Sequence, residues 1–441
     1  MRLLIKGGVI VNEGRSFQGD LLIENGRIAE ISNRGTMPRG ACQQEMDITG
    51  CFVLPGVIDE HVHFREPGLT AKADIRSESQ AAAAGGVTSY LEMPNTVPQT
   101  TTPEALVAKY RLAGEKSVVN YGFFLGATNQ NMDVFAAVPR QMIPGIKLFM
   151  GASTGNMLVD RRETLEKIFA ACHDLRLPLM THCEDTAMVN RNMRQAKEVH
   201  GEDPDITLHP QIRSAEACLA STTLAVELAR RFGTRLHVAH VTTARELELV
   251  GGHVTLEACV PHLLFSDADY LTKKALIKCN PAVKTRADRD SLRQGLTNGK
   301  ILTVATDHAP HLWEEKQGGA AKALSGMPMV QFSLLSMLEL VSQGVLSLER
   351  LVALMSHHPA DLFKIHERGF VREGYWADLA IVRPTNPWIL RKDGILSKCG
   401  WSPLEGETFH WEVAHTLCNG VLVYSRGWIE GGHAGKQLVF G

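Results

Sequence analysis

The chain has 441 residues, of which 44% are hydrophobic, and its formal net charge is −2. This length and composition allow a large buried core, while the balanced charge argues against a nucleic-acid or anionic-membrane partner. No apolar run approaches the roughly 18 residues that cross a bilayer, and the N-terminal run is too short for a signal peptide. Nine cysteines are scattered without CxxC spacing, which indicates free thiols. We therefore expect a cytoplasmic globular protein that acts on a small molecule.

The N-terminal part of the chain alternates short apolar runs with turn signals. These runs cover residues 3–11, 19–32 and 47–56, and the second contains an Asn-Gly pair that is typical of a two-residue hairpin turn. The pattern predicts a small group of β-strands.

From about residue 53 the pattern changes to short apolar runs that alternate with helix-like stretches. The clearest helical patterns lie at residues 77–86, 161–175, 214–233 and 288–299. Eight runs have the character of strands: residues 52–63, 87–93, 119–127, 145–150, 178–183, 235–241, 253–260 and 301–308. This alternation predicts an α/β fold with a parallel sheet, and eight units favour a (β/α)8 barrel over an open sheet.

Past about residue 366 the pattern returns to strands and turns, chiefly at residues 369–384 and 412–429. Because both chain ends share this character, we expect residues 1–52 and 366–441 to fold together as a small β-sandwich domain. Residues 53–365 would then form the barrel, which is the catalytic domain. The Gly- and Ala-rich stretch 311–327 follows the last predicted barrel strand, where binding loops lie, and is a candidate lid.

Polar side chains end several of the predicted barrel strands. His61 and His63 close the first strand, and their two-residue spacing places both side chains on one side of it. His182, His240 and Asp307 end three later strands. A single such histidine is most often a hydrogen-bonded core residue, but four histidines with a carboxylate form the ligand set that suits Zn²⁺ or a similar divalent ion. The set therefore predicts a metal site.

Lys147 lies inside an otherwise apolar strand, residues 145–150. Its ammonium could extend to solvent along an apolar stem or form a buried salt bridge. A lysine whose amine has added CO₂ would instead offer an anionic carbamate that can bridge two metals. The spacing of the residues leaves these interpretations open.

Seven motifs follow one another along the chain: DEHVHFREPG, EMPNT, GIKLFM, THCED, VAHVTT, NPAVKT and ATDHAPH. In this combination the sequence resembles the amidohydrolase superfamily and, within it, the long-chain dihydroorotases. The similarity covers nearly the whole chain, including YWADLAIV and NGVLVY, which resemble strands of the superfamily's accessory β-sandwich.

The resemblance implies a centre of two divalent metal ions, with zinc as the expected ion, although manganese and cobalt suit the same ligands. His61, His63 and Asp307 would bind the more buried ion, and His182 and His240 would bind the second. A carbamate on Lys147 would bridge the two ions. The resemblance also points to a homodimer.

The same resemblance assigns the substrate side of the site to Arg65, Asn95, Asn280 and His311. Arg65 and Asn95 would bind a substrate carboxylate, since a guanidinium forms two parallel charge-assisted hydrogen bonds to such a group. Allantoinase-like sequences tend to carry asparagine where Arg65 stands, and allantoin has no carboxylate.

Arg65 therefore favours the dihydroorotase reaction, the reversible cyclisation of N-carbamoyl-L-aspartate to L-dihydroorotate in de novo pyrimidine biosynthesis. A metal-bound hydroxide would attack the ring amide, with Asp307 as acid and base. Allantoinases, hydantoinases and dihydropyrimidinases share the metal motifs, so another cyclic-amide hydrolase is the first alternative. A non-catalytic paralogue that keeps the barrel as a scaffold is the second, although all the expected ligand types are present.

Overall fold

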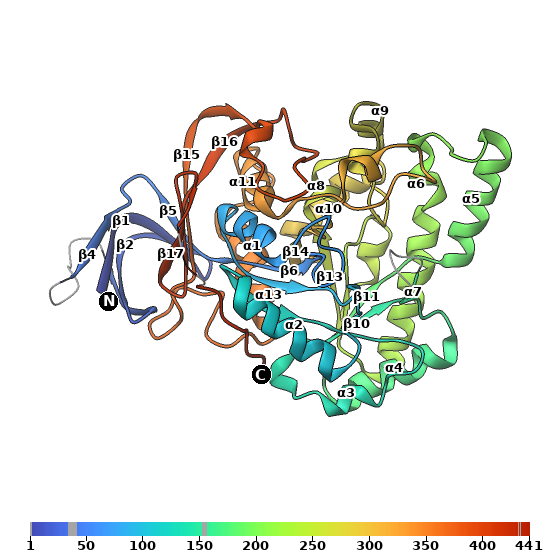
Figure 1. Ribbon diagram of the computed structural model, residues 1–441, viewed down its shortest axis with the longest axis horizontal. Helices are drawn as coiled ribbons and strands as arrows, with labels where there is room; N and C mark the ends of the chain where they lie inside the picture. Colours follow the sequence, from blue (N-terminus) through green and yellow to red (C-terminus); the bar gives the residue numbers. More distant parts are fainter. Residues whose placement is uncertain (1, 34–41, 152–156, 431, 433) are drawn as a thin grey trace.

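The computed structural model describes residues 2–33, 42–151, 157–430, 432 and 434–441. Figure 1 shows two regions: a β-sheet made from both ends of the chain, and a larger region whose strands are surrounded by helices. The strands of the larger region are parallel and alternate with helices, so the chain has the α/β class that the sequence predicts.

A nine-stranded sheet combines strands from the two chain ends. Its order is β18-β17-β16-β15-β5-β1-β2-β3, with β4 paired to β1. The N-terminal strands are β1 (Arg2–Asn12), β2 (Arg15–Glu24), β3 (Arg27–Asn33), β4 (Gln44–Asp47) and β5 (Phe52–Pro55). The C-terminal strands are β15 (Leu379–Ile389), β16 (Thr408–Cys418), β17 (Val421–Ser425) and β18 (Trp428–Ile429).

The two chain ends meet at β5, which lies parallel to β1 and antiparallel to β15. One apolar cluster includes Ile10, Leu21 and Ile23 from the N-terminal strands and Ile381 and Leu417 from the C-terminal strands. Because these side chains are removed from water together, the hydrophobic effect stabilises the pairing of the two ends.

The larger region contains two parallel sheets, β6-β7-β8 and β9-β10-β11-β12-β13-β14. Each of the eight predicted strand runs contains at least one of these strands. Their bounds are β6 (Val57–Val62), β7 (Val87–Glu92), β8 (Asn120–Phe123), β9 (Leu125–Gly126), β10 (Ile146–Phe149), β11 (Leu179–His182), β12 (Leu236–Val238), β13 (Val254–Cys259) and β14 (Thr303–Ala305).

The two parallel sheets approach each other at both edges. Phe124 alone separates β8 from β9. At the other edge, Val62 of β6 forms a parallel bridge with His308, three residues past the end of β14. The amide of His63 also donates to the carbonyl oxygen of His308 at 2.7 Å.

Helices follow most of these strands and lie outside the sheets (Figure 1). Their bounds are α1 (Ile75–Ala84), α2 (Pro103–Lys116), α3 (Val134–Ala137), α4 (Arg162–Asp174), α5 (Thr186–His200), α6 (His209–Ile212), α7 (Ala215–Phe232), α8 (Val260–Leu264), α9 (Tyr270–Lys273), α10 (Arg286–Thr297), α11 (Ser333–Ser342), α12 (Leu348–Val352) and α13 (His358–Leu362). The search of the described ranges finds no helix with the length and apolar character needed to cross a membrane.

The segment 311–327, a candidate lid, is hydrogen-bonded to its surroundings through Lys316. This side chain is buried, and its Nζ donates to the carbonyl oxygens of Lys278 at 3.1 Å, Leu324 at 2.7 Å and Gly326 at 2.7 Å. Of these acceptors only Lys278 lies outside the segment, so opening of the segment as a lid would have to break the bond to Lys278.

Candidate metal centre and active site

The residues predicted to bind metal gather at one end of the parallel strands. Five of them line a cavity, and Arg65, Asn95 and Asn280 lie in the same lining. The six predicted ligands are located within or just after β6, β10, β11, β12 and β14: His61 and His63, Lys147, His182, His240, and Asp307. This is the carboxyl end of the strands, where parallel α/β folds place their chemistry.

Three residues of the site have backbone torsions that non-glycine residues rarely adopt. The angle φ is +69° at Arg65, +38° at His240 and +49° at Asp307. A left-handed torsion of this kind costs about 1–3 kcal/mol and persists where the surrounding structure holds it. At these three positions the chain leaves the strands and presents the side chains of the site.

His61, His63 and Asp307 form the first ligand group. Asp307 Oδ1 lies 3.1 Å from His63 Nε2 and 3.5 Å from His61 Nε2. The other ring nitrogen of each histidine meets an acceptor: His61 Nδ1 lies 2.8 Å from Glu257 Oε1, and His63 Nδ1 lies 2.7 Å from Asn95 Oδ1. With the hydrogens on Nδ1, both Nε2 lone pairs face Asp307, so three ligand atoms converge as a metal ion requires.

His182 and His240 form the second group, in which His182 Nδ1 faces His240 Nε2 at 2.9 Å. His182 Nε2 lies 3.1 Å from Glu184 Oε2, a carboxylate that Arg213 also contacts. A hydrogen on His182 Nε2 leaves the Nδ1 lone pair directed toward His240. Two facing ring nitrogens of this kind need a proton or a cation between them, so this pair also fits a metal ion.

Lys147 is fully buried beside the first group, with its Nζ 3.4 Å from His61 Nε2. Within the part of the chain that the structure describes, it forms no ion pair with a carboxylate, so the buried salt bridge considered from the sequence is not observed there. Burial lowers the pKa of Lys147 to about 8. A lowered pKa favours the neutral amine, which is the form that can add CO₂.

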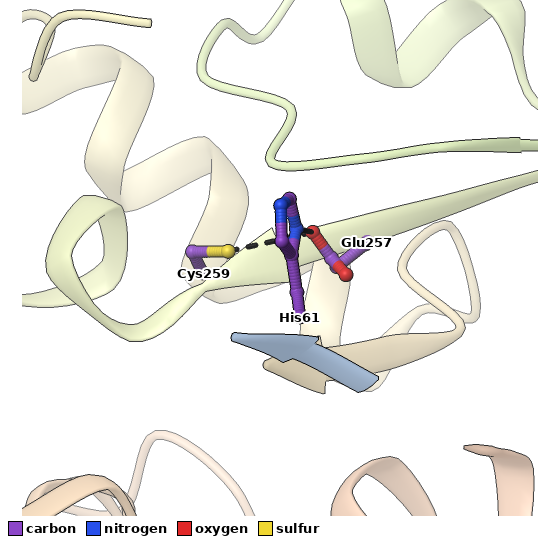
Figure 2. A group of neighbouring side chains, drawn as sticks. All are labelled: His61, Glu257 and Cys259. Atoms are coloured by element: carbon purple, nitrogen blue, oxygen red, sulfur yellow. Dashed lines mark hydrogen bonds and ion pairs between the residues drawn. The ribbon is translucent and has the colours of Figure 1, made fainter. Parts of the chain in front are cut away.

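The carboxylates that orient the histidines are residues that were not predicted from the sequence. Figure 2 shows the Glu257 carboxylate against the ring of His61, with Cys259 beside it on β13. The carboxylate of Glu184 contacts the ring of His182 in the same way. Glu257 carried a signal in the sequence, because it is a charged residue inside the otherwise apolar run 253–260, as Lys147 is in its own strand. Carboxylates behind metal-binding imidazoles fix the tautomer and the ring orientation.

The charge states of these residues suit divalent cations. Burial lowers the pKa of His63 to about 4, and it also lowers the pKa of His182 and of His240. Burial alone would raise the pKa of Asp307, but the neighbouring His61 and His63 hold it well below the usual range. Neutral imidazoles beside an ionised carboxylate are the donors that Zn²⁺ and similar ions prefer, so the residues fit the implied metals.

On the other side of the cavity lie a buried guanidinium and a side-chain amide with a buried oxygen. The side chain of Arg65 is 3% exposed, and its Nε donates to the carbonyl oxygen of Pro310 at 3.0 Å. Among the described residues Arg65 forms no ion pair, and the buried Oδ1 of Asn280 has no hydrogen-bond partner. A buried guanidinium without a carboxylate partner is costly, so this side of the cavity suits an anionic ligand.

His311 lies behind Arg65 and not in the cavity lining. Its Nδ1 is 3.1 Å from Lys72 Nζ, and its Nε2 is 2.9 Å from the carbonyl oxygen of Ser325 and 3.1 Å from Arg65 Nη2. Both ring nitrogens thus contact protein groups. The structure brings eight of the ten predicted site residues to the cavity surface, with Lys147 against His61 and His311 against Arg65.

Comparisons with known proteins agree with this arrangement. Residues 52–423 match the Amidohydrolase family. The chain is 32% identical to a dihydroorotase of Lactobacillus acidophilus, over 97% of this chain and 100% of that protein. It is also 32% identical to an allantoinase of Bacillus velezensis, over 96% and 94% of the two chains. Among solved structures, L-hydantoinase (dihydropyrimidinase) from Arthrobacter aurescens is similar, with a TM-score of 0.92, 28% identity and 99% of each chain covered. The chain belongs to the amidohydrolase family.

Proposed function

We propose that this protein is a dihydroorotase, which closes N-carbamoyl-L-aspartate to L-dihydroorotate with loss of water and also catalyses the reverse reaction. The observation that carries the proposal is the buried guanidinium of Arg65, which has no carboxylate partner among the described residues and lines the same cavity as the histidines. Dihydroorotate bears a carboxylate next to its cyclic amide, so one ligand can meet both sides of the cavity.

The metal ligands follow from the two groups. His61, His63 and Asp307 would hold one divalent ion, His182 and His240 the other, and a carbamate on Lys147 would join them. Zinc is the expected ion, because imidazole and carboxylate donors suit it. When bound, such a pair of ions provides a hydroxide nucleophile near neutral pH and polarises an amide carbonyl.

Asp307 would be the catalytic acid and base. Its carboxylate is kept ionised by His61 and His63, so it can accept a proton from the attacking water. It would then pass this proton to the ring nitrogen as the amide bond breaks, and in the cyclisation direction the same transfers run in reverse.

Arg65, Asn95 and Asn280 would orient the substrate. The guanidinium would donate two parallel hydrogen bonds to the carboxylate, while His311 would contact the guanidinium from the side away from the cavity. Asn95 Oδ1 already contacts His63, so its amide NH₂ is the group that would reach the substrate. Fixing the ring relative to Asp307 lowers the entropic part of the barrel enzyme's activation barrier, an effect that reaches about 7 kcal/mol in well-oriented reactions.

The proposal includes the architecture that the sequence predicts. The two parallel sheets would form one closed (β/α)8 barrel over residues 53–365, which the short gap between β8 and β9 and the bridge between Val62 and His308 support. Residues 1–52 and 366–441 would form the composite β-sandwich domain, and the sheet shared by the two chain ends supports this division.

A hydantoinase or allantoinase activity is the second candidate. Its support is the similarity of the chain to an allantoinase and to a hydantoinase structure. The metal residues would be the same in either case. Arg65 weighs against this candidate, because hydantoin and allantoin have no carboxylate to pair with a buried guanidinium.

The test is a substrate comparison with purified protein loaded with zinc, manganese or cobalt. We expect hydrolysis of L-dihydroorotate, and cyclisation of N-carbamoyl-L-aspartate, with a kcat/KM at least about 10-fold above those for allantoin and hydantoin, since charge-assisted hydrogen bonds contribute about 1.5–3 kcal/mol. A preference for allantoin or hydantoin would overturn the proposal in favour of the second candidate.

A further inference from the structure

We propose that Glu257 is a positioning residue that couples the two halves of the metal centre, because one of its carboxylate oxygens holds both His61 and His240. The inference rests on the proposed two-ion centre and assigns a task to a residue outside the two proposed ligand groups.

The geometry centres on a single atom. Glu257 Oε1 lies 2.8 Å from His61 Nδ1 and accepts the backbone N–H of His240 at 2.8 Å. The thiol of Cys259 donates to the same oxygen at 3.4 Å (Figure 2). All four residues are at most 2% exposed. His61 belongs to the first ligand group and His240 to the second, so this oxygen is a direct connection between them.

For His61, the contact determines which nitrogen can bind a metal. A carboxylate is only an acceptor when ionised, so His61 must carry its hydrogen on Nδ1 and present the Nε2 lone pair to Asp307. The negative charge also makes the imidazole a stronger donor to a cation. His63 has a neutral acceptor, Asn95 Oδ1, in the corresponding place. The two histidines of the first group are therefore oriented by unlike partners.

For His240, the contact acts through the backbone. Its Nδ1 has no hydrogen-bond partner among the described residues, so no hydrogen bond fixes the ring from that side. Its φ of +38° is strained, and the hydrogen bond from its N–H to Glu257 helps to hold this torsion. Loss of the carboxylate should therefore release the second ligand group as well as the first.

The charge of Glu257 is also directed to this centre. Within the described ranges its one ion pair is with His61, and no lysine or arginine pairs with it. A buried carboxylate needs a compensating positive charge, and a cation bound at His61 Nε2 would supply it through the imidazole.

The experiment compares Glu257→Leu, Glu257→Gln and the wild-type protein. Each metal-free protein is titrated with Co²⁺ in competition with a chelating dye, and the titration resolves the binding constants of two ions. Visible absorption of the bound Co²⁺ reports the geometry of each site. The control is Glu246→Gln. Glu246 is equally buried, but its carboxylate contacts threonines, with Thr222 Oγ1 at 2.7 Å and Thr243 Oγ1 at 2.9 Å.

We expect Glu257→Leu to weaken both binding steps by about 10–100-fold, as loss of a carboxylate behind a metal-binding histidine does. Glu257→Gln keeps an acceptor oxygen without the charge, so it should weaken both steps less and preserve the Co²⁺ spectrum. Glu246→Gln should lower the melting temperature and leave both constants unchanged.

Three outcomes would overturn the inference: unchanged constants in both Glu257 variants, weakening of only one step, or equal weakening in Glu246→Gln. Failure of the proposed function would be a different result. In that case the wild-type protein would either bind no Co²⁺, or bind two ions and still not act on dihydroorotate. Because Glu257→Gln has nearly the shape of the native residue, it keeps the test valid if Glu257→Leu does not fold.

Discussion

The two sides of the cavity differ in how the protein satisfies their polar atoms. On the metal side, the outward ring nitrogens of His61, His63 and His182 each meet an acceptor from the protein. On the substrate side, Arg65 has a carbonyl partner but no ion pair among the described residues, and Asn280 Oδ1 has no partner. His240 Nδ1 on the metal side also lacks a partner among the described residues, so the difference lies in the charged groups: carboxylates stand behind His61 and His182, whereas no carboxylate pairs with Arg65. The metal residues therefore accord with the amidohydrolase family, and Arg65 is the residue on which the proposed substrate depends.

The largest expected effect comes from Asp307, which we propose to be both a metal ligand and the catalytic acid and base. Asp307→Asn keeps the size of the side chain but removes the proton acceptor, so kcat should fall by about 10³-fold or more. Steady-state kinetics on dihydroorotate measure this loss, and circular dichroism should show an unchanged fold. A rate close to that of the wild type would remove Asp307 from the mechanism.

Lys147→Met should impair metal binding and leave the substrate side of the cavity unchanged. It removes the amine that would carry the carbamate and leaves an apolar side chain of similar length, so metal affinity should fall by about 10–100-fold, with a comparable loss of kcat. Metal analysis measures the stoichiometry, and NMR of protein equilibrated with ¹³C-labelled CO₂ should show a carbamate carbon in the wild type only. A wild-type spectrum without this signal would show that Lys147 is a plain amine.

Arg65→Met should impair substrate binding and leave the metal side of the cavity unchanged. Loss of the charge-assisted hydrogen bonds should raise KM for dihydroorotate by about 10–100-fold, while both metal ions stay bound. Arg65→Lys is the matched variant, since it keeps the charge and loses the two-point geometry. Its KM should lie between those of the wild type and Arg65→Met. If Arg65→Met released the metals, the two sides would not be separable.

The smallest effect concerns pH and the metal-free protein. Burial lowers the pKa of His63 and of His237 to about 4 from an ordinary value of 6.5. Between these values the unfolded chain binds protons that the folded chain does not, so stability present above pH 6.5 is lost as the pH falls toward 4, by up to about 3 kcal/mol per residue. Urea unfolding at neutral and mildly acidic pH measures this loss of stability. The variant His237→Gln should show a smaller change in the free energy of unfolding per pH unit. If the urea midpoint of unfolding did not fall on acidification, His63 and His237 would not have the lowered pKa values in the folded protein.

Much of the fold follows from local patterns. The predicted helix at 214–233 is α7, because Ser214 accepts the N–H of Ala217 at one end and Gly233 takes a left-handed torsion at the other. The helix α5 was not among the clearest patterns, since Val189 is its only fully buried residue and most of its surface is polar. Its few apolar side chains pack against α6 and α7 and form a narrow stripe on an otherwise polar helix.

The candidate site was predictable where a residue type and a strand end coincide, as for His61 and Asp307. Glu257 was not, because its partner His61 is 196 residues away and the contact depends on how the strands are arranged in space. His311 was expected in the cavity, but the chain returns at Ser325, whose carbonyl oxygen lies 2.9 Å from its Nε2. Pairings between distant segments are set by tertiary packing, which one-dimensional spacing does not contain.

The most direct test of the account compares kcat/KM for L-dihydroorotate and for dihydrouracil, which is the same ring without the carboxylate. If Arg65 recognises that group, the wild-type protein should prefer dihydroorotate by about 10²-fold, and Arg65→Met should lose most of this preference. Equal activity on the two rings, or a preference for dihydrouracil, would contradict the central claim that the buried guanidinium selects a carboxylate-bearing substrate.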